Sequence, residues 1–367
     1  MKIFVFGSSI TSSYWNGAAT YYRGIYENLA ALGHDVTFAE PEIYDRQKNR
    51  DADAEYARVI VYQTPADIDS LIEQARDADL VIKHSGVGAD DELLEHRVLE
   101  CQAERTLVAY WDVDAPATLA RVESNCDDGF RPLIPRYDFV FTYGGGPPVV
   151  DHYLALGAKN CYPIYNALEP ASHHPEKKDP TLACDLVFVG HRLPDREKRV
   201  QDFFFRAAEL APDLSFILGG EGWGGKALPK NMRWIGHVAT MDHNRVNGSA
   251  RMVLNINRDS MASVGFSPPT RVFEAAGAGA CLITDAWTGV ESFFEPGREI
   301  LVAQNAEEIV LHLRSTTPRR ARELGEAMLS RALRDHTYGL RAREVHSILS
   351  EALADRRASQ AQVSAAD

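Results

Sequence analysis

The chain has 367 residues, of which 45% are hydrophobic and 25% charged, and this composition is ordinary for a soluble globular protein. Its length exceeds what one typical core accommodates and predicts two domains. The formal net charge of -13 disfavours a nucleic acid as the main partner, and no apolar run approaches the ~20 residues of a membrane helix.

The compartment is inferred from the cysteines and the first residues. Five cysteines are scattered along the chain without a Cys-x-x-Cys pair. This spacing disfavours a disulfide framework or a cysteine zinc site and favours a reducing environment. Residues 1–7 are too short and end too abruptly for a signal peptide, so we expect a cytoplasmic protein. A basic run at 314–322 is interpreted as a solvated helix start, the alternative being peripheral contact with an anionic membrane surface.

The first half alternates strands with helices. Strands are predicted at 3–6, 33–39, 59–62, 80–84, 107–111, 139–142 and 160–165. Helices are predicted at 18–32, 65–78, 90–104 and 148–156. Such alternation predicts a mostly parallel sheet that is covered on both faces.

Residues 166–181 are rich in proline, histidine and charge and form the strongest linker signal in the chain. His173 and His174 fall within this segment. No matching group of Cys, His or carboxylate residues stands near them in the sequence, so we interpret both as facing solvent and predict no metal site.

A second α/β series follows the linker. Strands are predicted at 186–189, 214–219, 233–237, 252–256, 280–284 and 299–302, and helices at 196–210, 318–334 and 340–356. We expect two Rossmann-like domains over residues 1–168 and 169–338, with a cleft between the C-terminal edges of their sheets. A C-terminal helix (339–357) is predicted to pack back on the cleft region, and residues 358–367 are predicted to be a disordered tail.

The most informative stretch is 265–285, which is predicted to be a loop, a helix and a buried strand. Ser267 is predicted to cap the helix, and Pro268 and Pro269 suit its first turn. Free backbone N–H groups and the helix dipole make an anion site there, and Arg271 adds a fixed charge.

Glu274 stands one helical turn after Thr270 and can share its face. A phosphate site with a carboxylate one turn away fits a nucleoside diphosphate. The phosphates would bind at the start of the helix, and the ribose hydroxyls would bind the carboxylate of Glu274. The alternative is an ordinary capped helix that packs through its alanines.

Five motifs stand out together: YWDVDAPAT at 110–118, YGGGPP at 143–148, DLVFVGHRLPDRE at 185–197, NINRDSMA at 255–262 and the stretch at 265–285. With these motifs the chain resembles the CgeB-like (spore maturation protein type) family of glycosyltransferases. The resemblance implies an α/β GT-B fold, two Rossmann-like domains facing a central cleft. It also implies a nucleotide-sugar donor on the C-terminal domain and an acceptor on the N-terminal one. Phe266 stands eight residues before Glu274, where the broader retaining pattern has a second Glu, so retention or inversion stays open.

Donor-binding candidates follow the buried strands of the second half. They are Gly190, His191, Arg192, Arg196, Lys226, Gly236, His237 and Arg258, together with Ser267, Thr270, Arg271 and Glu274. Glycine turns let a backbone approach phosphates, and arginines stabilise a leaving diphosphate. The alternatives are a solvated helix start at 195–197, a flexible glycine loop before Lys226, core packing of Trp234 near Gly236, and an ordinary surface loop at Arg258.

Acceptor-side candidates lie in the first half. A carboxylate of Asp112 or Asp114, just past a strand, can deprotonate an acceptor hydroxyl as general base, whereas Asp114 can also cap a helix. The strand-to-helix loops that shape this side contribute Ser8, Ser9, Asn16, Gly17, Gly144 and Gly145.

These observations lead to one hypothesis with two rivals. We expect a metal-independent glycosyltransferase of the hexosyltransferase type, without a cofactor, that closes around its donor to exclude water. Its acceptor would be a hydroxyl of a cell-surface glycan, a protein or a small molecule. The rivals are a nucleotide-sugar 2-epimerase of the same fold and a non-catalytic nucleotide-sugar-binding protein.

Overall fold

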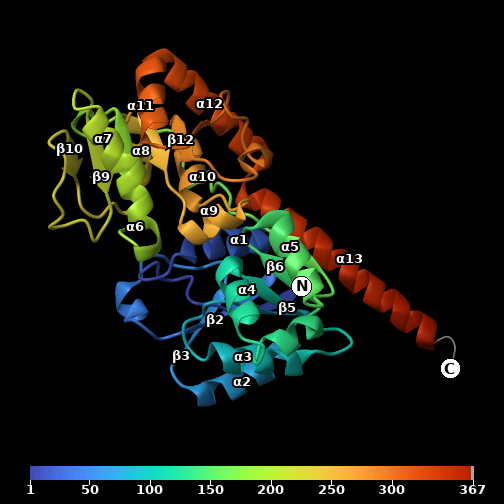
Figure 1. Cartoon of the computed structure of the whole chain (residues 1–367). Coiled ribbons are helices and arrows are strands. Elements are labelled where there is room, and N and C mark those ends of the chain that lie inside the picture. The colour runs from blue at the N-terminus through green and yellow to red at the C-terminus, as the bar shows by residue number, and fades with distance from the viewer. Residues whose placement is uncertain (365–367) are drawn as a thin grey trace. The chain divides into compact units, whose positions relative to one another are not determined.

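The structure is a computed structural model that describes residues 1–364, and it divides into two compact units. The first unit contains Met1–Tyr165 and the chain from Tyr338 onward, and the second is Asn166–Thr337 (Figure 1). The predicted boundary after residue 168 lies three residues beyond the observed one. Leu168 already belongs to the second unit, where it forms a bridge with Thr337 and its N–H donates to the carbonyl of His336 at 2.8 Å.

The first unit is built on a seven-stranded sheet in the order β3-β2-β1-β4-β5-β6-β7, and every pair is parallel. Its strands are β1 Lys2–Phe6, β2 Asp35–Pro41, β3 Arg58–Tyr62, β4 Leu80–His84, β5 Leu107–Asp112, β6 Phe139–Thr142 and β7 Cys161–Pro163. Its helices are α1 Ala19–Ala31, α2 Pro65–Ala75, α3 Asp91–Arg97, α4 Ala115–Ser124, α5 Gly146–Ala155 and α13 Tyr338–Ser364. The predicted parallel α/β architecture is thus confirmed for this half.

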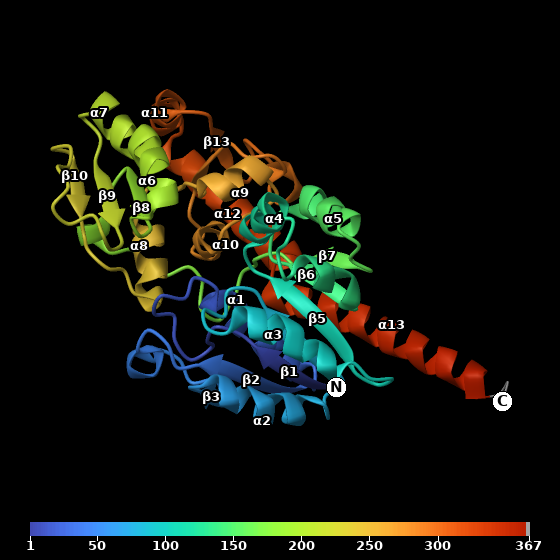
Figure 2. The same ribbon diagram turned by 60° about the horizontal axis from the view of Figure 1, so that its bottom comes forward.

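The second unit has a six-stranded parallel sheet in the order β10-β9-β8-β11-β12-β13, one edge of which is visible in Figure 2. Its strands are β8 Leu186–Val189, β9 Phe216–Gly219, β10 Met232–Trp234, β11 Met252–Asn255, β12 Leu282–Asp285 and β13 Leu301–Ala303. Its helices are α6 Pro194–Val200, α7 Arg206–Leu210, α8 His243–Ser249, α9 Asp259–Val264, α10 Thr270–Gly277, α11 Ala306–Ser315 and α12 Pro318–Asp335. A π-helical turn, Gln201–Phe205, joins α6 to α7.

The apolar residues of β8, β9, β11 and β12 form the core of the second unit, together with inward-facing residues of the helices around them. Strands in such a sheet are buried on both faces, which explains their continuous apolar runs. The short helices α8, α9 and α11 were not predicted from the sequence.

The C-terminal helix α13 packs against α1 within the first unit. It departs from the prediction at its end, because it continues to Ser364, so the predicted disorder of 358–364 is wrong; residues 365–367 lie outside the described part. The segment is rich in alanine and glutamine, which are good helix formers, so an established helix propagates through it at little cost. Within residues 1–364, no helix has the length and apolar character to cross a membrane.

The contact between α1 and α13 depends on a glycine. A Cβ atom placed on Gly24 would overlap the ring of Tyr338. We expect Gly24→Val to lower the free energy of unfolding by about 1–3 kcal/mol, because overpacking forces side chains off their rotamers. Urea unfolding measures the change. Gly129→Val is the matched control, because a Cβ there meets nothing within 4 Å, and an equal loss in both variants would contradict this account.

Candidate functional site

The candidate donor site gathers at the carboxyl ends of β8 and β11, which are neighbours in the second sheet. The chain order reverses here, since β9 lies on one side of β8 and β11 on the other. Ligands of open parallel α/β sheets bind at the carboxyl edge beside such a reversal. Residues 190–192 leave β8 at this edge, residues 256–258 leave β11, and α10 begins beside them.

Two arginines, Arg196 and Arg271, lie side by side at this edge. Their guanidinium carbons stand 5.6 and 5.1 Å from the centroid of the Phe188 ring. A Cβ atom on Gly190 would lie 2.9 Å from an Nη2 atom of each arginine. A side chain at position 190 would therefore displace both guanidinium groups from the places that they occupy.

Neither of these arginines forms an ion pair within the described residues. Arg196 is only 7% exposed, and its Nη2 donates to the carbonyl of His191 at 2.6 Å. Arg271 donates to the carbonyl of Val189 at 2.5 Å and to Oδ1 of Asn255 at 2.9 Å. Burial, followed by the charge of Arg271, lowers the pKa of Arg196 to about 9. A buried cation beside a partly buried one, both held only by neutral acceptors, is costly unless an anion joins them.

Arg258 adds a third guanidinium near this pair. Its Nε forms an ion pair with Asp195 at 2.5 Å, and its charge contributes to the lowered pKa of Arg196. The predicted role of Arg258 in donor binding remains a prediction. In the structure, Arg258 pairs with Asp195, the residue that precedes Arg196 in the sequence.

Arg192 and Lys226 are placed differently from Arg196. Both bind the carboxylate of Glu197, at 2.7 Å each. Hydrogen bonds from the two cations lower the pKa of Glu197 to about 2. Each of them thus already has a carboxylate partner, which makes them weaker phosphate candidates than Arg196 and Arg271.

Glycines bring the loops after β8, β9 and β10 into close backbone contact. The N–H of Gly220 donates to the carbonyl of Gly236 at 2.7 Å, and a Cβ on Gly220 would overlap the carbonyl of Gly190. The rings of His191 and His237 stack with centroids 6.1 Å apart. Four predicted donor residues, Gly190, His191, Gly236 and His237, are therefore brought together.

Two tryptophans of this region, one exposed and one buried, bond to glycine backbones. Trp234 is 38% exposed, and its indole N–H donates to the carbonyl of Gly220 at 2.9 Å, so it is not the core residue of the alternative interpretation. Trp223, from the glycine-rich loop, is the buried one, and its N–H donates to the carbonyl of Gly190 at 2.8 Å. Both indoles thereby fix glycine backbones that surround the site.

The start of α10 corrects one prediction. The helix begins at Thr270, with Pro269 at the N-cap position and no side-chain cap. Ser267 is buried, and its hydroxyl donates to the carbonyl of Gly265 at 2.9 Å. The predicted cap by Ser267 is wrong because the two prolines delay the first helical residue, which leaves the serine inside the preceding loop.

Phe266, which stands where the broader retaining pattern has a second Glu, has an unusual backbone conformation. Phe266 has a φ of 47°, a left-handed conformation that is uncommon for an aromatic residue. Its N–H donates to the carbonyl of Thr288 at 2.7 Å, and its ring packs against Gly289, where a Cβ would overlap it. This loop therefore carries an apolar ring at the position where the retaining pattern has a carboxylate.

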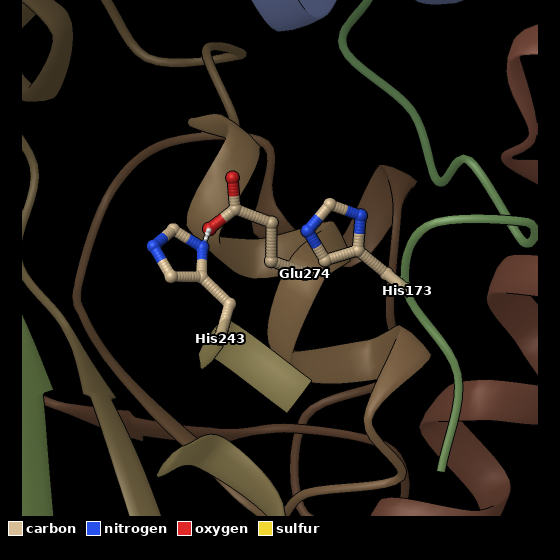
Figure 3. Close-up of side chains that lie close together, drawn as sticks. All are labelled: His173, His243 and Glu274. Carbon is tan, nitrogen blue, oxygen red and sulfur yellow. Dashed lines mark ion pairs between the residues drawn. The ribbon is translucent and has the colours of Figure 1, made fainter. Parts of the chain in front are cut away.

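Glu274 lies between two imidazole rings, as Figure 3 shows. Nδ1 of His243 is 3.2 Å from a carboxylate oxygen of Glu274, and a ring nitrogen of His173 points toward it from the other side. Burial alone would raise the pKa of Glu274, but His243, His173 and Arg271 hold it at about 2. The carboxylate is therefore ionised and able to accept hydrogen bonds from hydroxyl groups.

His173 corrects another prediction. It is only 3% exposed, whereas His174 is exposed as predicted. The linker crosses α10 at Gly277, where a Cβ would lie 2.7 Å from the carbonyl of His173, and this close approach carries the imidazole inward. The sequence indicated neither this crossing nor the contribution of His243, because the cluster joins residues separated by 31 and more positions.

Two buried polar groups near β11 were also missed. Asp285 forms an ion pair with Arg199 at 2.6 Å and accepts the N–H of Asn257. Asn255 holds Arg271 and also bonds Thr284. The signal available was a polar residue at the end of each apolar strand, which in a parallel sheet marks the carboxyl edge.

In the first unit, Asp112 is fully buried and saturated with hydrogen bonds. One oxygen accepts from the Ser85 hydroxyl at 2.7 Å, the Asp114 N–H at 3.0 Å and the Thr118 hydroxyl at 3.1 Å, and the other from the Tyr153 hydroxyl at 2.5 Å. No face is open to an acceptor, so the structure contradicts Asp112 as a general base. Asp114, which is partly exposed at the start of α4, keeps that candidacy.

The other acceptor-side candidates organise loops at the same edge of the first sheet. The Ser8 hydroxyl donates to Oδ1 of Asn16 at 2.9 Å, and the Asn16 amide donates to the carbonyl of Ser9 at 2.8 Å. These three side chains are buried and shape the loop, whereas Gly17 is exposed. Gly144 and Gly145 are buried before α5, where Gly145 has a φ of 89°.

Aromatic side chains flank the loop after β1. Tyr14, Trp15, Tyr44 and Asp45 line an open cavity of about 570 Å³. Trp15 and Tyr44 are largely exposed, and both have positive φ angles. Exposed aromatic faces beside a carboxylate are suited to contact with a sugar ring, whose C–H groups pack on the ring face while its hydroxyls bond the acid.

Comparisons with known proteins were made for sequence and for structure. Residues 196–347, less than half of the chain, match a family model described as glycosyl transferase-like. The matched range begins at Arg196 and includes Arg271 and Glu274. A comparison with curated protein sequences gives no significant match.

Solved structures of glycosyltransferases share the fold. Anabaena HepE in complex with UDP-glucose has a TM-score of 0.65 and 12% identity, over 96% of this chain and 100% of that one. Sucrose-phosphate synthase from Thermosynechococcus elongatus has a TM-score of 0.66 and 13% identity, over 97% and 100%. An alpha-glucosyltransferase in complex with UDP-glucose and DNA has a TM-score of 0.70 and 12% identity, over 95% and 99%. The predicted GT-B fold is thereby confirmed.

The saturated environment of Asp112 predicts a structural role. We expect Asp112→Asn to lower the free energy of unfolding by about 1–3 kcal/mol, because an amide cannot accept all four hydrogen bonds. Urea unfolding measures the loss, and Asp127→Asn, on an exposed turn, is the control with a change below about 0.5 kcal/mol. A stable Asp112→Asn protein that has lost only turnover would instead restore Asp112 as a catalytic candidate.

Proposed function

We propose that this protein transfers a sugar from a nucleoside-diphosphate sugar to an acceptor hydroxyl, and the match of residues 196–347 to a glycosyl transferase-like family model supports this. The glycosidic bond of the donor breaks, the nucleoside diphosphate leaves with the bonding electrons, and the acceptor oxygen forms the new bond as it loses its proton. The observation that carries the proposal is a pair of adjacent guanidinium groups beside Gly190, of the buried Arg196 and the partly buried Arg271, neither of which has a carboxylate partner within the described residues.

The diphosphate is assigned to this arginine pair. Each guanidinium retains N–H groups beyond those used to hold it in place, and the glycine at 190 lets phosphate oxygens approach closely. Charge developing on the leaving diphosphate is stabilised by donors that are already in place before the reaction. The first turn of α10, beside Thr270 and Arg271, adds backbone N–H groups and the positive end of its dipole.

The ribose is assigned to Glu274. Its carboxylate is ionised and lies one turn into α10, the helix whose start faces the phosphates. A carboxylate accepts hydrogen bonds from two neighbouring hydroxyls, and these charge-assisted bonds are stronger than neutral ones. UDP-glucose, the donor bound to HepE, is therefore the first donor to test on this chain.

Metal independence forms part of the proposal. Two fixed arginines and a helix dipole supply the positive charge that a Mg²⁺ ion would otherwise provide to the diphosphate. Transfer is therefore expected to persist in EDTA.

The acceptor is assigned to the first unit, through Asp114 and the aromatic cavity at Trp15 and Tyr44. Asp114 would take the proton from the acceptor hydroxyl. The exposed aromatic faces favour a carbohydrate acceptor over a purely aliphatic one. A cytoplasmic location and the CgeB-like subfamily complete the proposal; five free cysteines and the motif at 185–197 support them.

The diphosphate assignment predicts that Arg196→Met weakens nucleotide binding without lowering the stability of the protein. We expect this variant to bind UDP about 10- to 100-fold more weakly, because charge-assisted bonds to the diphosphate are lost. Its stability without nucleotide should be unchanged or higher, because an unpaired buried charge is removed. Titration calorimetry with UDP, GDP and ADP, together with urea unfolding, measures both quantities.

Arg206→Met is the matched control, because Arg206 is exposed on α7 and pairs with Glu209. If none of the three nucleotides binds the wild-type protein, the proposed function fails. Binding without any consumption of UDP-glucose in EDTA, with or without a sugar acceptor, would favour a non-catalytic binding protein. Conversion of the donor without acceptor would favour an epimerase.

The ribose assignment predicts that Glu274 makes the protein bind a ribonucleotide more tightly than the corresponding deoxynucleotide. The wild-type protein should bind UDP about 10-fold more tightly than 2′-deoxy-UDP or 3′-deoxy-UDP, since each lost hydrogen bond to a charged group is worth about 1.5 kcal/mol or more. In Glu274→Ala this ratio should fall toward one, whereas Glu307→Ala, on the outer helix α11, should keep it. Equal ratios in the wild-type and Glu274→Ala proteins would place the ribose elsewhere.

A further inference from the structure

We infer that His173, His243 and Glu274 form a binding site for Zn²⁺, and that Zn²⁺ bound there competes with the nucleotide for Glu274. The site itself stands on the geometry of the second unit alone. The competition rests on the proposed function, because it requires Glu274 to bind the ribose.

The three residues offer the ligand set and spacing that Zn²⁺ requires. One ligand atom from each residue lies within 4.8 Å of the other two. Ligand atoms that each stand about 2.0–2.1 Å from a tetrahedral Zn²⁺ are about 3.3 Å apart. The 3.2 Å between Nδ1 of His243 and the Glu274 oxygen matches this spacing, and His173 has to approach by about 1.5 Å at most. Figure 3 shows both rings turned toward the carboxylate.

The buried Nε2 of His173 has no hydrogen-bond partner within the described residues. Nδ1 of His243 has the carboxylate of Glu274 as its ion-pair partner at 3.2 Å. A buried polar nitrogen without a partner is destabilising. A metal ion at this place would bind Nε2 of His173 together with Nδ1 of His243 and the carboxylate.

The ligand types favour a borderline-soft divalent ion. Two imidazole ligands select Zn²⁺ over Mg²⁺ and Ca²⁺, which prefer oxygen.

The charges around the site limit its affinity. Arg271 stands close enough to Glu274 to lower its pKa, and this cation opposes a second one. With three protein ligands and an unfavourable neighbouring charge, we expect micromolar rather than nanomolar binding. A three-ligand site also keeps a coordination position open, unlike a closed structural zinc site.

Competition follows because Glu274 serves both ligands. A carboxylate oxygen bound to Zn²⁺ cannot accept a hydrogen bond from ribose, and the added positive charge sits where the hydroxyls must approach. For simple competition, Zn²⁺ at ten times its dissociation constant weakens nucleotide binding about 11-fold. The proposed transfer, which needs no metal, would then be inhibited by Zn²⁺.

The metal site is tested without nucleotide. The protein is stripped with EDTA, dialysed, and titrated with Zn²⁺ against a chromophoric chelator, in a Cys126→Ser background because Cys126 is exposed. We expect one equivalent to bind, and His173→Asn to weaken binding at least 30-fold. His174→Asn, one residue away and exposed, should bind like the parent. Should His173→Asn not fold, His243→Asn takes its place. No Zn²⁺ binding by the parent at 100-fold excess, or unchanged binding in both variants, overturns the site.

The competition is tested by UDP titration with and without Zn²⁺. We expect Zn²⁺ to raise the dissociation constant of UDP about 10-fold in the parent and less than 2-fold in His173→Asn, which also controls for Zn²⁺ bound by UDP itself. If Zn²⁺ binds but does not change the dissociation constant of UDP, the competition is overturned. His173 and His243 would then only position the carboxylate of Glu274. Failure of UDP, GDP and ADP alike to bind even in EDTA contradicts the proposed function, while the Zn²⁺ titration still decides the site.

Discussion

The constraint on which the proposed donor site depends is the repulsion between two adjacent guanidinium groups, one buried and one partly buried. Arg196 and Arg271 share the face of Phe188 and the space left by Gly190, and within the described residues neither has a carboxylate partner. Stability alone would favour an apolar pair at these positions. Two cations there are favourable when an anion neutralises them, and this is the physical argument for proposing a diphosphate at this place.

Carboxylates in the two units illustrate how burial decides a role. Asp112 and Glu274 both lie in motifs that were predicted to be functional. Both side chains are largely screened from solvent. Asp112 accepts four hydrogen bonds from hydroxyl and backbone donors, so it fixes the loop before α4. The carboxylate of Glu274 forms an ion pair with His243 at 3.2 Å and has the imidazole of His173 beside it. It therefore keeps capacity for a ligand, whether ribose or a metal ion.

Much of the fold could be predicted because parallel strands are buried on both faces and read as apolar runs. The strands from β1 to β13 and the long helices were found in this way. The start of α10 was misplaced because Pro268 and Pro269 suit both a first turn and the loop before it. The last turns of α13 were missed because small polar residues are compatible with either disorder or helix propagation.

The sequence by itself determined the two α/β halves, the linker and the residue types at the carboxyl edge of the second sheet, since these depend on local pattern. Only the tertiary structure decided which charges are free to act. It paired Arg192 and Lys226 with Glu197, left Arg196 and Arg271 together, and brought His173 and His243 to Glu274. Such choices depend on distances between segments that are far apart along the chain, and no local pattern encodes them.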